Sequence, residues 1–191
     1  NGKGTLLTRY AITLKDGMLA DYRRLADDEE NPDGATIWYA YLEIAQDNSW
    51  FNGQAYLDTL NPEAVRQFIS VTHEGYHNSL GEYFGTIIPA IFTDEPQFTH
   101  KTTLSFANER IDVTIPWTDD LPKTYEKTYG INLLDVLPEV FWELPDGKAS
   151  VARYRYHDHV AERFTQAFAD QVGEWCEAHA VPLTILRVAG I

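Results

Sequence analysis

Cysteine, methionine and positive charge are scarce in this chain of 191 residues. Cys176 is the only cysteine, so no disulfide can form within the chain. Its place on an apolar helical stripe predicts a buried structural thiol rather than a nucleophile. Only 15 Lys and Arg residues accompany 29 Asp and Glu residues, which gives a formal net charge of −14. That balance argues against nucleic acid as a partner and against docking on anionic membranes, because both need a basic surface.

Long apolar runs are also missing. No stretch approaches the ~18 consecutive apolar residues of a transmembrane helix, so we predict no membrane span. No secretory signal is visible, although the chain begins at Asn1 rather than Met. The cellular location stays open, with the cytoplasm favoured. Aromatic residues, by contrast, are abundant, with 5 Trp, 11 Tyr and 9 Phe.

The hydrophobic pattern predicts a hairpin followed by alternating strands and helices. The hairpin covers 5–25 with its turn at 15–17, and an acidic loop occupies 27–34. Further strands are expected at 36–44, 86–93 and 182–188. Helices are expected from Asn61-Pro62 to Gly81 or Gly85, from Thr118 to Gly130, from Asn132 past Pro138, and from Ser150 to about His179.

The order strand, loop, helix, strand is typical of a βαβ unit with parallel strands. Three strands beyond the hairpin cannot close an eight-stranded barrel, so the sheet is either open or part of a larger barrel. Because the chain ends directly after a strand, we favour the larger barrel. We therefore expect an α/β protein with a partial (β/α)8 (TIM-type) barrel, about strands 3 to 5 with their helices, plus an N-terminal β-hairpin. Residues 1–191 would form a single domain that is a fragment of that barrel.

The stretch 86–96 holds the most informative pattern. An apolar, β-branched run ends in Asp94, Glu95 and Pro96. The run lacks alternation, which favours a strand buried on both faces, and Pro96 ends it. The two carboxylates would then lie at the carboxyl end of a buried strand, where α/β folds bind ligands. An acid held against low-dielectric walls can act as a general acid near neutral pH. The alternative is that two acids merely begin a solvated loop.

The loop before the Asn61 helix has the composition of a carbohydrate site. It combines aromatic platforms with side chains that can bind hydroxyls, and Trp117 in a later loop could close the pocket. The candidate sugar-binding residues are Trp50, Asn52, Tyr56, Asp58, Asp94 and Trp117. Cleavage of a glycosidic bond usually needs two carboxyl groups, and Glu95 suits the proton donor. No cofactor is needed for this chemistry.

A competing motif lies on the predicted helix. His73-Glu74-Gly75-Tyr76-His77 matches H-E-x-x-H, whose two imidazoles can hold zinc while the glutamate acts as a base. Glu95 could be a third ligand. The context fits poorly, because Gly75 weakens the helix and the histidines would flank its buried face. A zinc metallopeptidase is therefore the lesser hypothesis, and we expect no bound metal.

Several motifs in order resemble one family of proteins. They are Trp50 to Ala64, Phe84-Gly85, Ile91 to Pro96, Leu121 to Gly130, Leu137 to Glu139 and Gly173 to Cys176. Over roughly 5–183 the chain resembles large bacterial glycoside hydrolases with a (β/α)8 catalytic barrel, namely the α-L-rhamnosidase-like members and their relatives. The segment Thr184 to Arg187 departs from the Gly-His turn that often follows the fifth strand there.

The resemblance implies roles for individual residues. Asp94-Glu95-Pro96 matches the Asn-Glu-Pro that follows the fourth barrel strand, so Glu95 would be the acid/base. Asp94 would stand where an asparagine often binds the 2-hydroxyl, which leaves the sugar open. The strands at 37–44, 86–93 and 183–187 would be the third, fourth and fifth. The second catalytic carboxylate would come from a later strand outside this chain.

The sequence thus favours a glycoside hydrolase that acts on an oligosaccharide or glycoside. This chain would be a fragment of that enzyme, and the fragment need not be active alone. A non-catalytic carbohydrate-binding module would use the same aromatic residues without Glu95. Because a partial barrel exposes strand edges, a homodimer is an expected consequence.

Overall fold

The computed structural model describes residues 4–186 in two compact units. Of the described residues, unit 1 comprises 4–56, 100–115 and 119–159, and unit 2 comprises 57–99, 116–118 and 160–186. Helices and parallel strands are both present, so the α/β class is confirmed, but residues 4–186 do not close a barrel. No helix among these residues is long and apolar enough to span a membrane.

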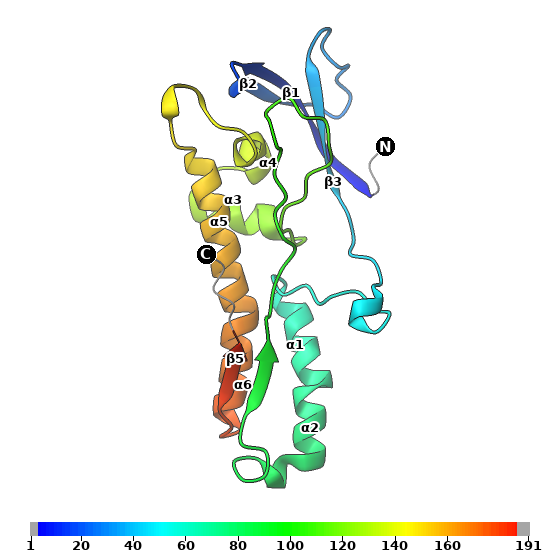
Figure 1. Cartoon of the computed structure of the whole chain (residues 1–191), viewed down its shortest axis with the longest axis vertical. Coiled ribbons are helices and arrows are strands. Elements are labelled where there is room, and N and C mark those ends of the chain that lie inside the picture. The colour runs from blue at the N-terminus through cyan, green and yellow to red at the C-terminus, as the bar shows by residue number, and fades with distance from the viewer. Residues whose placement is uncertain (1–3, 187–191) are drawn as a thin grey trace. The chain divides into compact units, whose positions relative to one another are not determined.

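Unit 1 is built on an antiparallel sheet of β1 (Thr5–Lys15), β2 (Met18–Leu25) and β3 (Thr36–Leu42), in the order β2-β1-β3 (Figure 1). The turn between β1 and β2 has φ values of 52° at Asp16 and 78° at Gly17. Positive φ at both central residues is typical of a type I′ hairpin turn, which confirms the predicted hairpin.

The prediction that 37–44 is the third, parallel strand of a barrel is wrong. β3 pairs antiparallel with β1, in a register that includes Tyr10↔Trp38. Its partner is the neighbouring hairpin rather than the strand that follows the Asn61 helix. A local apolar run specifies a strand but not the strand it pairs with.

The sheet contacts helical segments of unit 1 through α4 (Leu133–Val136) and the 3-10 turn η4 (Pro145–Gly147). Unit 1 also contains α3 (Leu121–Tyr129), the 3-10 turn η3 (Leu137–Val140) and the first part of α5 (Val151–Phe164). Tyr10 donates a hydrogen bond to the Leu134 carbonyl at 2.5 Å, and the Trp38 and Trp142 rings meet edge to face at 4.7 Å. Pro138 is the second residue of η3, and the predicted helix after Asn132 is split there into α4 and η3, as expected.

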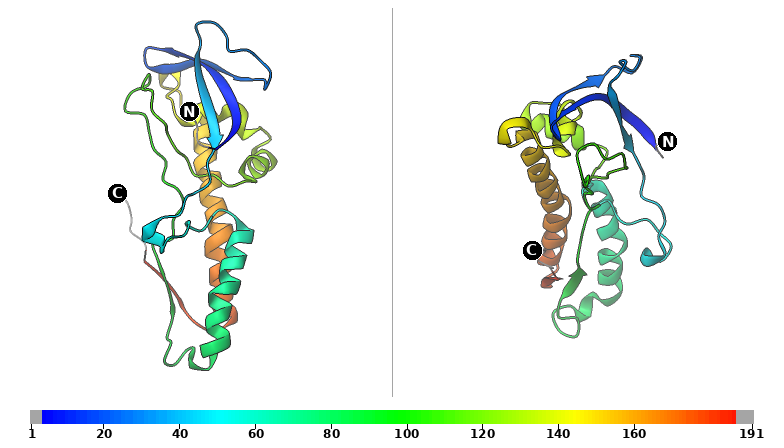
Figure 2. Two further views of the ribbon diagram at one scale, coloured as in Figure 1. Left: turned by 90° about the vertical axis from the view of Figure 1, so that its right-hand side faces the viewer. Right: turned by 45° about the horizontal axis from the view of Figure 1, so that its top comes forward.

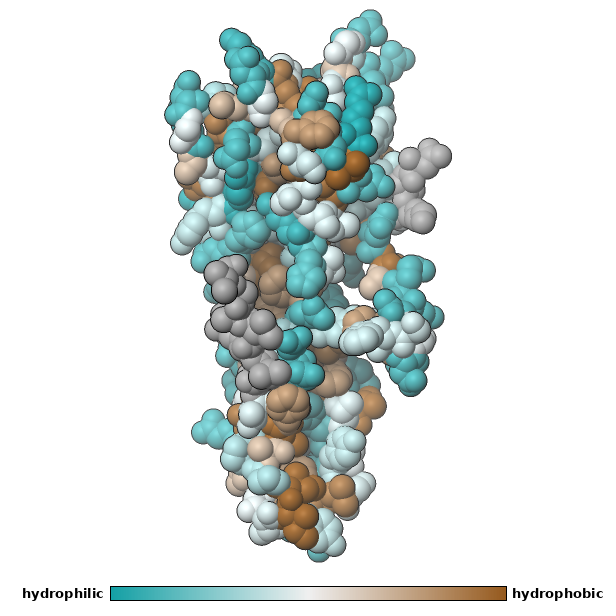
Figure 3. All heavy atoms as spheres, viewed as in Figure 1, coloured by the Kyte–Doolittle hydropathy of each residue, from teal (hydrophilic) through white to brown (hydrophobic). Residues whose placement is uncertain are grey.

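Unit 2 contains β4 (Ile91–Asp94) and β5 (Leu183–Leu186), which pair in parallel from Ile91↔Leu183 to Asp94↔Leu186. The strand is shorter than the predicted 86–93 and begins at Ile91, because 85–87 form a turn closed by a bridge between Phe84 and Ile88. The predicted burial on both faces is also wrong, since Phe92 is 59% exposed. Figure 3 shows apolar side chains on the surface in this part of the molecule. The end of the predicted last strand, beyond 186, lies outside the described residues.

Helices flank this strand pair. α1 (Pro62–Val71) begins at Asn61, whose side chain accepts hydrogen bonds from the Glu63 and Ala64 N–H groups, as predicted. α2 (His73–Leu80) follows almost in line, as Figure 2 shows. Packed against α1, the helix α5 passes through a π-helical turn, η5 (Thr165–Ala169), into α6 (Asp170–Ala178). The core between them consists of Val65, Ile69, Phe168, Val172, Trp175, Cys176 and Val181.

Candidate functional site

Glu95 directly follows the carboxyl end of β4, as predicted. Its backbone has φ of 41°, in the left-handed region that residues other than Gly, Asn and Asp seldom adopt. Such conformations concentrate at functional sites, where the surrounding structure holds them. Within the described residues, however, Asp94 and Glu95 are exposed, so the predicted low-dielectric walls are not formed by this part of the chain.

Two hydrogen bonds tie this loop region of unit 2 together. The buried Thr59 hydroxyl donates to the Gln97 carbonyl at 2.7 Å, which anchors the chain two residues after Glu95. The buried Thr118 hydroxyl donates to Asp58 Oδ2 at 2.6 Å. The loop after β4, the segment before α1 and the segment 116–118 therefore converge.

Four of the predicted site residues belong to these segments of unit 2. Asp94 ends β4 and Glu95 follows it, Asp58 precedes α1, and the half-buried Trp117 is adjacent to Thr118. The Asp58 carboxylate also accepts the Leu60 N–H at 3.1 Å, so both of its oxygens have protein partners. Asp58 thus holds the loops together, and its contact with a sugar stays a prediction.

The other three predicted sugar-binding residues belong to unit 1. Asn48 accepts the Trp50 N–H at 2.9 Å and bridges Gln54, so the loop folds into a small closed turn. Asn52 lies in the left-handed region with φ of 57°. Trp50 is 86% exposed at the tip of this turn. An indole held out into solvent can stack on a sugar ring, and its approach to Glu95 stays a prediction.

Tyr56 has a different environment. Its ring packs against Phe51 with centroids 4.8 Å apart, and its side chain is half-buried. This contact braces the loop below Trp50. A direct role for Tyr56 in sugar binding stays a prediction.

The H-E-x-x-H motif does not place its two histidines at one point. His73 is 8% exposed, and its ring lies between the rings of Phe68 and Trp175, with centroids 5.4 and 5.0 Å away. Its Nδ1 pairs with the Thr72 hydroxyl, and burial lowers its pKa. His77 instead approaches His179, with ring centroids 4.3 Å apart. His179 was not among the predicted site residues, since it lies far along the chain.

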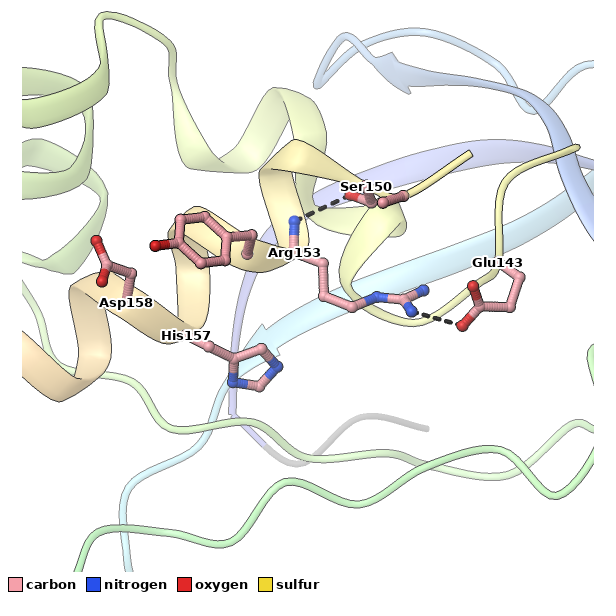
Figure 4. A pocket seen from close by; sticks show the side chains of 7 residues that line it. Glu143, Ser150, Arg153, His157 and Asp158 are labelled. Atoms are coloured by element: carbon pink, nitrogen blue, oxygen red, sulfur yellow. Dashed lines mark hydrogen bonds and ion pairs between the residues drawn. The ribbon is translucent and has the colours of Figure 1, made fainter. Parts of the chain in front are cut away.

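A cavity of about 540 Å³ opens in unit 1, beside the start of α5. Its lining includes Glu143, Ser150, Arg153, His157 and Asp158 (Figure 4). Arg153 is engaged in structural contacts, because its guanidinium pairs with Glu143 and donates to the Glu139 and Trp142 carbonyls. None of the predicted site residues lines this cavity. It therefore does not coincide with the candidate sugar site.

The chain matches no family model, no curated protein and no solved structure. The functional argument accordingly depends on the residues themselves and on their arrangement.

Proposed function

We propose that this chain forms part of the (β/α)8 catalytic barrel of a glycoside hydrolase, with Glu95 as the general acid/base. The observation that carries the proposal is the position of Glu95. It follows a strand that pairs in parallel, has a left-handed backbone, and lies in a loop anchored by Thr59. Residues at the carboxyl ends of barrel strands are those that perform catalysis in this fold.

The parallel pair supports the barrel assignment in part. β4 and β5 would be the fourth and fifth strands, and α5, η5 and α6 would belong to the connection between them. A parallel sheet normally has both faces covered, whereas Phe92 on β4 is 59% exposed. Further strands and helices would bury such side chains. β3 has no place in this barrel, because it pairs with β1.

The proposed chemistry uses the Glu95 carboxyl group first in its protonated state and then in its ionised state. Protonated Glu95 would donate its proton to the glycosidic oxygen as the bond to the anomeric carbon breaks. The resulting carboxylate would then accept a proton from the attacking water in a retaining enzyme. A second carboxylate, from a strand beyond those described, would act as nucleophile or base. Asp94 and Trp117 would contact the sugar.

Glu95→Gln in the protein encoded by the complete reading frame tests this role. On aryl glycosides with poor leaving groups we expect kcat to fall by about 10²–10⁴-fold, because proton donation is lost. Activated aryl glycosides, which need little protonation, should lose far less in the glycosylation step. Glu174→Gln, at an exposed glutamate on α6, is the matched control. An equal effect on both substrate classes would remove Glu95 from the acid/base role.

The exposure of Trp50 supports a second candidate function, binding of carbohydrate without catalysis. Trp50→Ala should then weaken oligosaccharide binding in isothermal titration calorimetry, while Glu95→Gln leaves the affinity unchanged. Hydrolysis by any form of the protein that depends on Glu95 would reject this alternative.

A further inference from the structure

Three side chains of unit 2 bring metal-ligating atoms together where α2 begins and α6 ends. One ligand atom each from Glu74, His77 and His179 lies within 4.8 Å of the others, and Glu74 Oε1 is 3.9 Å from His179 Nε2. A tetrahedral Zn²⁺ site, with bonds of about 2.0–2.2 Å, holds its ligand atoms roughly 3.3–3.6 Å apart. Small side-chain rotations would close that difference. We propose that these three residues bind one divalent transition-metal ion of the Zn²⁺ type.

Helix geometry accounts for the first two ligands. Glu74 and His77 are three positions apart on α2, so their side chains project from the same face. His179 is the C-cap residue of α6 and completes the set from a second element. An ion bound there would link the two helices.

The protonation state of His179 suits a metal ligand. Its Nδ1 lies 2.8 Å from the Trp175 carbonyl, and a carbonyl oxygen can only accept a hydrogen bond. Nδ1 therefore carries a proton, so in the neutral imidazole Nε2 holds the lone pair, and Nε2 lies 3.9 Å from Glu74 Oε1. The indole of Trp175 stacks on the imidazole, with centroids 4.1 Å apart and planes 21° apart, which fixes the ring orientation. Such a backbone acceptor behind a histidine is the usual support of a metal-bound imidazole.

Trp175 also orients the carboxylate. Its Nε1–H donates to Glu74 Oε1 at 2.6 Å. The same residue thus supports two of the three ligands, one through its carbonyl and one through its indole. Ligand carboxylates in metal sites commonly have an outer hydrogen-bond donor of this kind.

The position of the His77 ring depends on a glycine. A Cβ at Gly81 would lie 2.9 Å from His77 Cδ2 and 3.0 Å from His77 Nε2. The backbone φ of Gly81 is −58°, which any residue can adopt, so a larger residue here would displace the His77 ring without straining the backbone. The missing side chain lets His77 lie beside His179.

The donor set selects the class of ion. Two imidazoles and one carboxylate suit Zn²⁺ and its neighbours, whereas Ca²⁺ and Mg²⁺ prefer oxygen ligands alone. The side chains of Glu74 and His179 are 40% and 20% exposed, so water can complete the coordination shell. This inference is independent of Glu95, and it differs from an H-E-x-x-H site because His73 takes no part.

Calorimetric titration of the metal-free chain with ZnCl₂ tests the site. We expect one Zn²⁺ per chain, with affinity reduced by more than about 100-fold in His77→Gln and in His179→Gln, since outer-shell changes alone cost 10–100-fold. Glu74→Gln should also weaken binding, although it keeps an acceptor for the indole. Circular dichroism should show native folding of all three, because the side chains are partly exposed. His157→Gln, at a histidine of unit 1, is the matched control and should bind as the wild type does.

Two further variants separate this site from other arrangements. Trp175→Phe keeps an aromatic ring but removes the indole donor, and we expect Zn²⁺ affinity to fall by about 10–100-fold. His73→Gln should leave the affinity unchanged. Loss of binding in His73→Gln with normal binding in His179→Gln would overturn the proposal in favour of the H-E-x-x-H motif. Equal losses of Zn²⁺ affinity in His157→Gln and His179→Gln would indicate nonspecific binding by histidines and would also overturn the proposal.

Discussion

The hydrogen bond from Thr118 to Asp58 offers a direct test of how the candidate site is held together. Thr118 is 3% exposed, and its hydroxyl donates to Asp58 Oδ2 at 2.6 Å. Thr118→Val removes that donor while nearly keeping the shape of the side chain. Hydrogen bonds to charged groups contribute about 1.5–3 kcal/mol, so we expect the free energy of unfolding to fall by that amount. With a urea m value of about 2 kcal/mol/M, the unfolding midpoint would drop by roughly 1 M.

A double-mutant cycle identifies the partner. Asp58→Ala removes the acceptor, and on that background Thr118→Val should cost far less, with a coupling energy of about 0.5–3 kcal/mol. Thr165→Val is the control, because Thr165 is exposed and its hydroxyl donates to the Ala161 carbonyl one helical turn away. Its effect should stay within about 0.5 kcal/mol. The same cost for Thr118→Val on both backgrounds would refute the assignment of this bond.

The surroundings of Gly81, His157 and Cys176 lead to three further predictions. Gly81→Ala should weaken Zn²⁺ binding in calorimetry, because the new methyl group displaces the His77 ring. The urea midpoint should not fall, because alanine tolerates the backbone conformation at this position. An unchanged Zn²⁺ affinity would contradict this reasoning. Burial and the nearby charge of Lys101 lower the pKa of His157 in the folded protein. The unfolded chain therefore takes up this proton first, so the free energy of unfolding should fall as the pH drops below about 6.5. An NMR titration should place its midpoint below 6.5, moving upward in Lys101→Gln, and a midpoint above 6.5 would be inconsistent. Cys176 is 2% exposed and burial raises the pKa of its thiol, so a thiol reagent should react rapidly only in urea; fast reaction of the native protein would exclude a buried thiol.

Short-range features were predictable because short-range physics determines them. The turn at Asp16-Gly17 needs two residues that tolerate positive φ, and the sequence places them together. Asn61 and Asn132 were predicted as helix N-caps, and both side chains accept backbone N–H groups of the first turn. The buried thiol of Cys176 followed from the apolar stripe of its helix.

Long-range pairing was not predictable from the same signals. Thr118 has the residue type of an N-cap, yet α3 begins at Leu121 and the Thr118 hydroxyl bonds Asp58 instead. The run at 36–44 specified a strand correctly, but its partner is β1. For the candidate site, the position of Glu95 after a strand was visible in the sequence. The Thr59 bond that anchors its loop joins residues 38 positions apart and was not.

The H-E-x-x-H pattern shows how packing decides the use of a local motif. Spacing alone predicts that His73 and His77 share one side of a helix. At the junction of α1 and α2, however, the Thr72 hydroxyl bonds both the Phe68 carbonyl and His73 Nδ1, and the His73 ring is enclosed by Phe68 and Trp175. Its neighbours Glu74 and His77 are partly exposed, and there α6 supplies the supporting carbonyl and indole of Trp175 and its C-cap residue His179. A motif therefore determines which side chains share a face, and the element that packs on that face determines which of them can act as ligands.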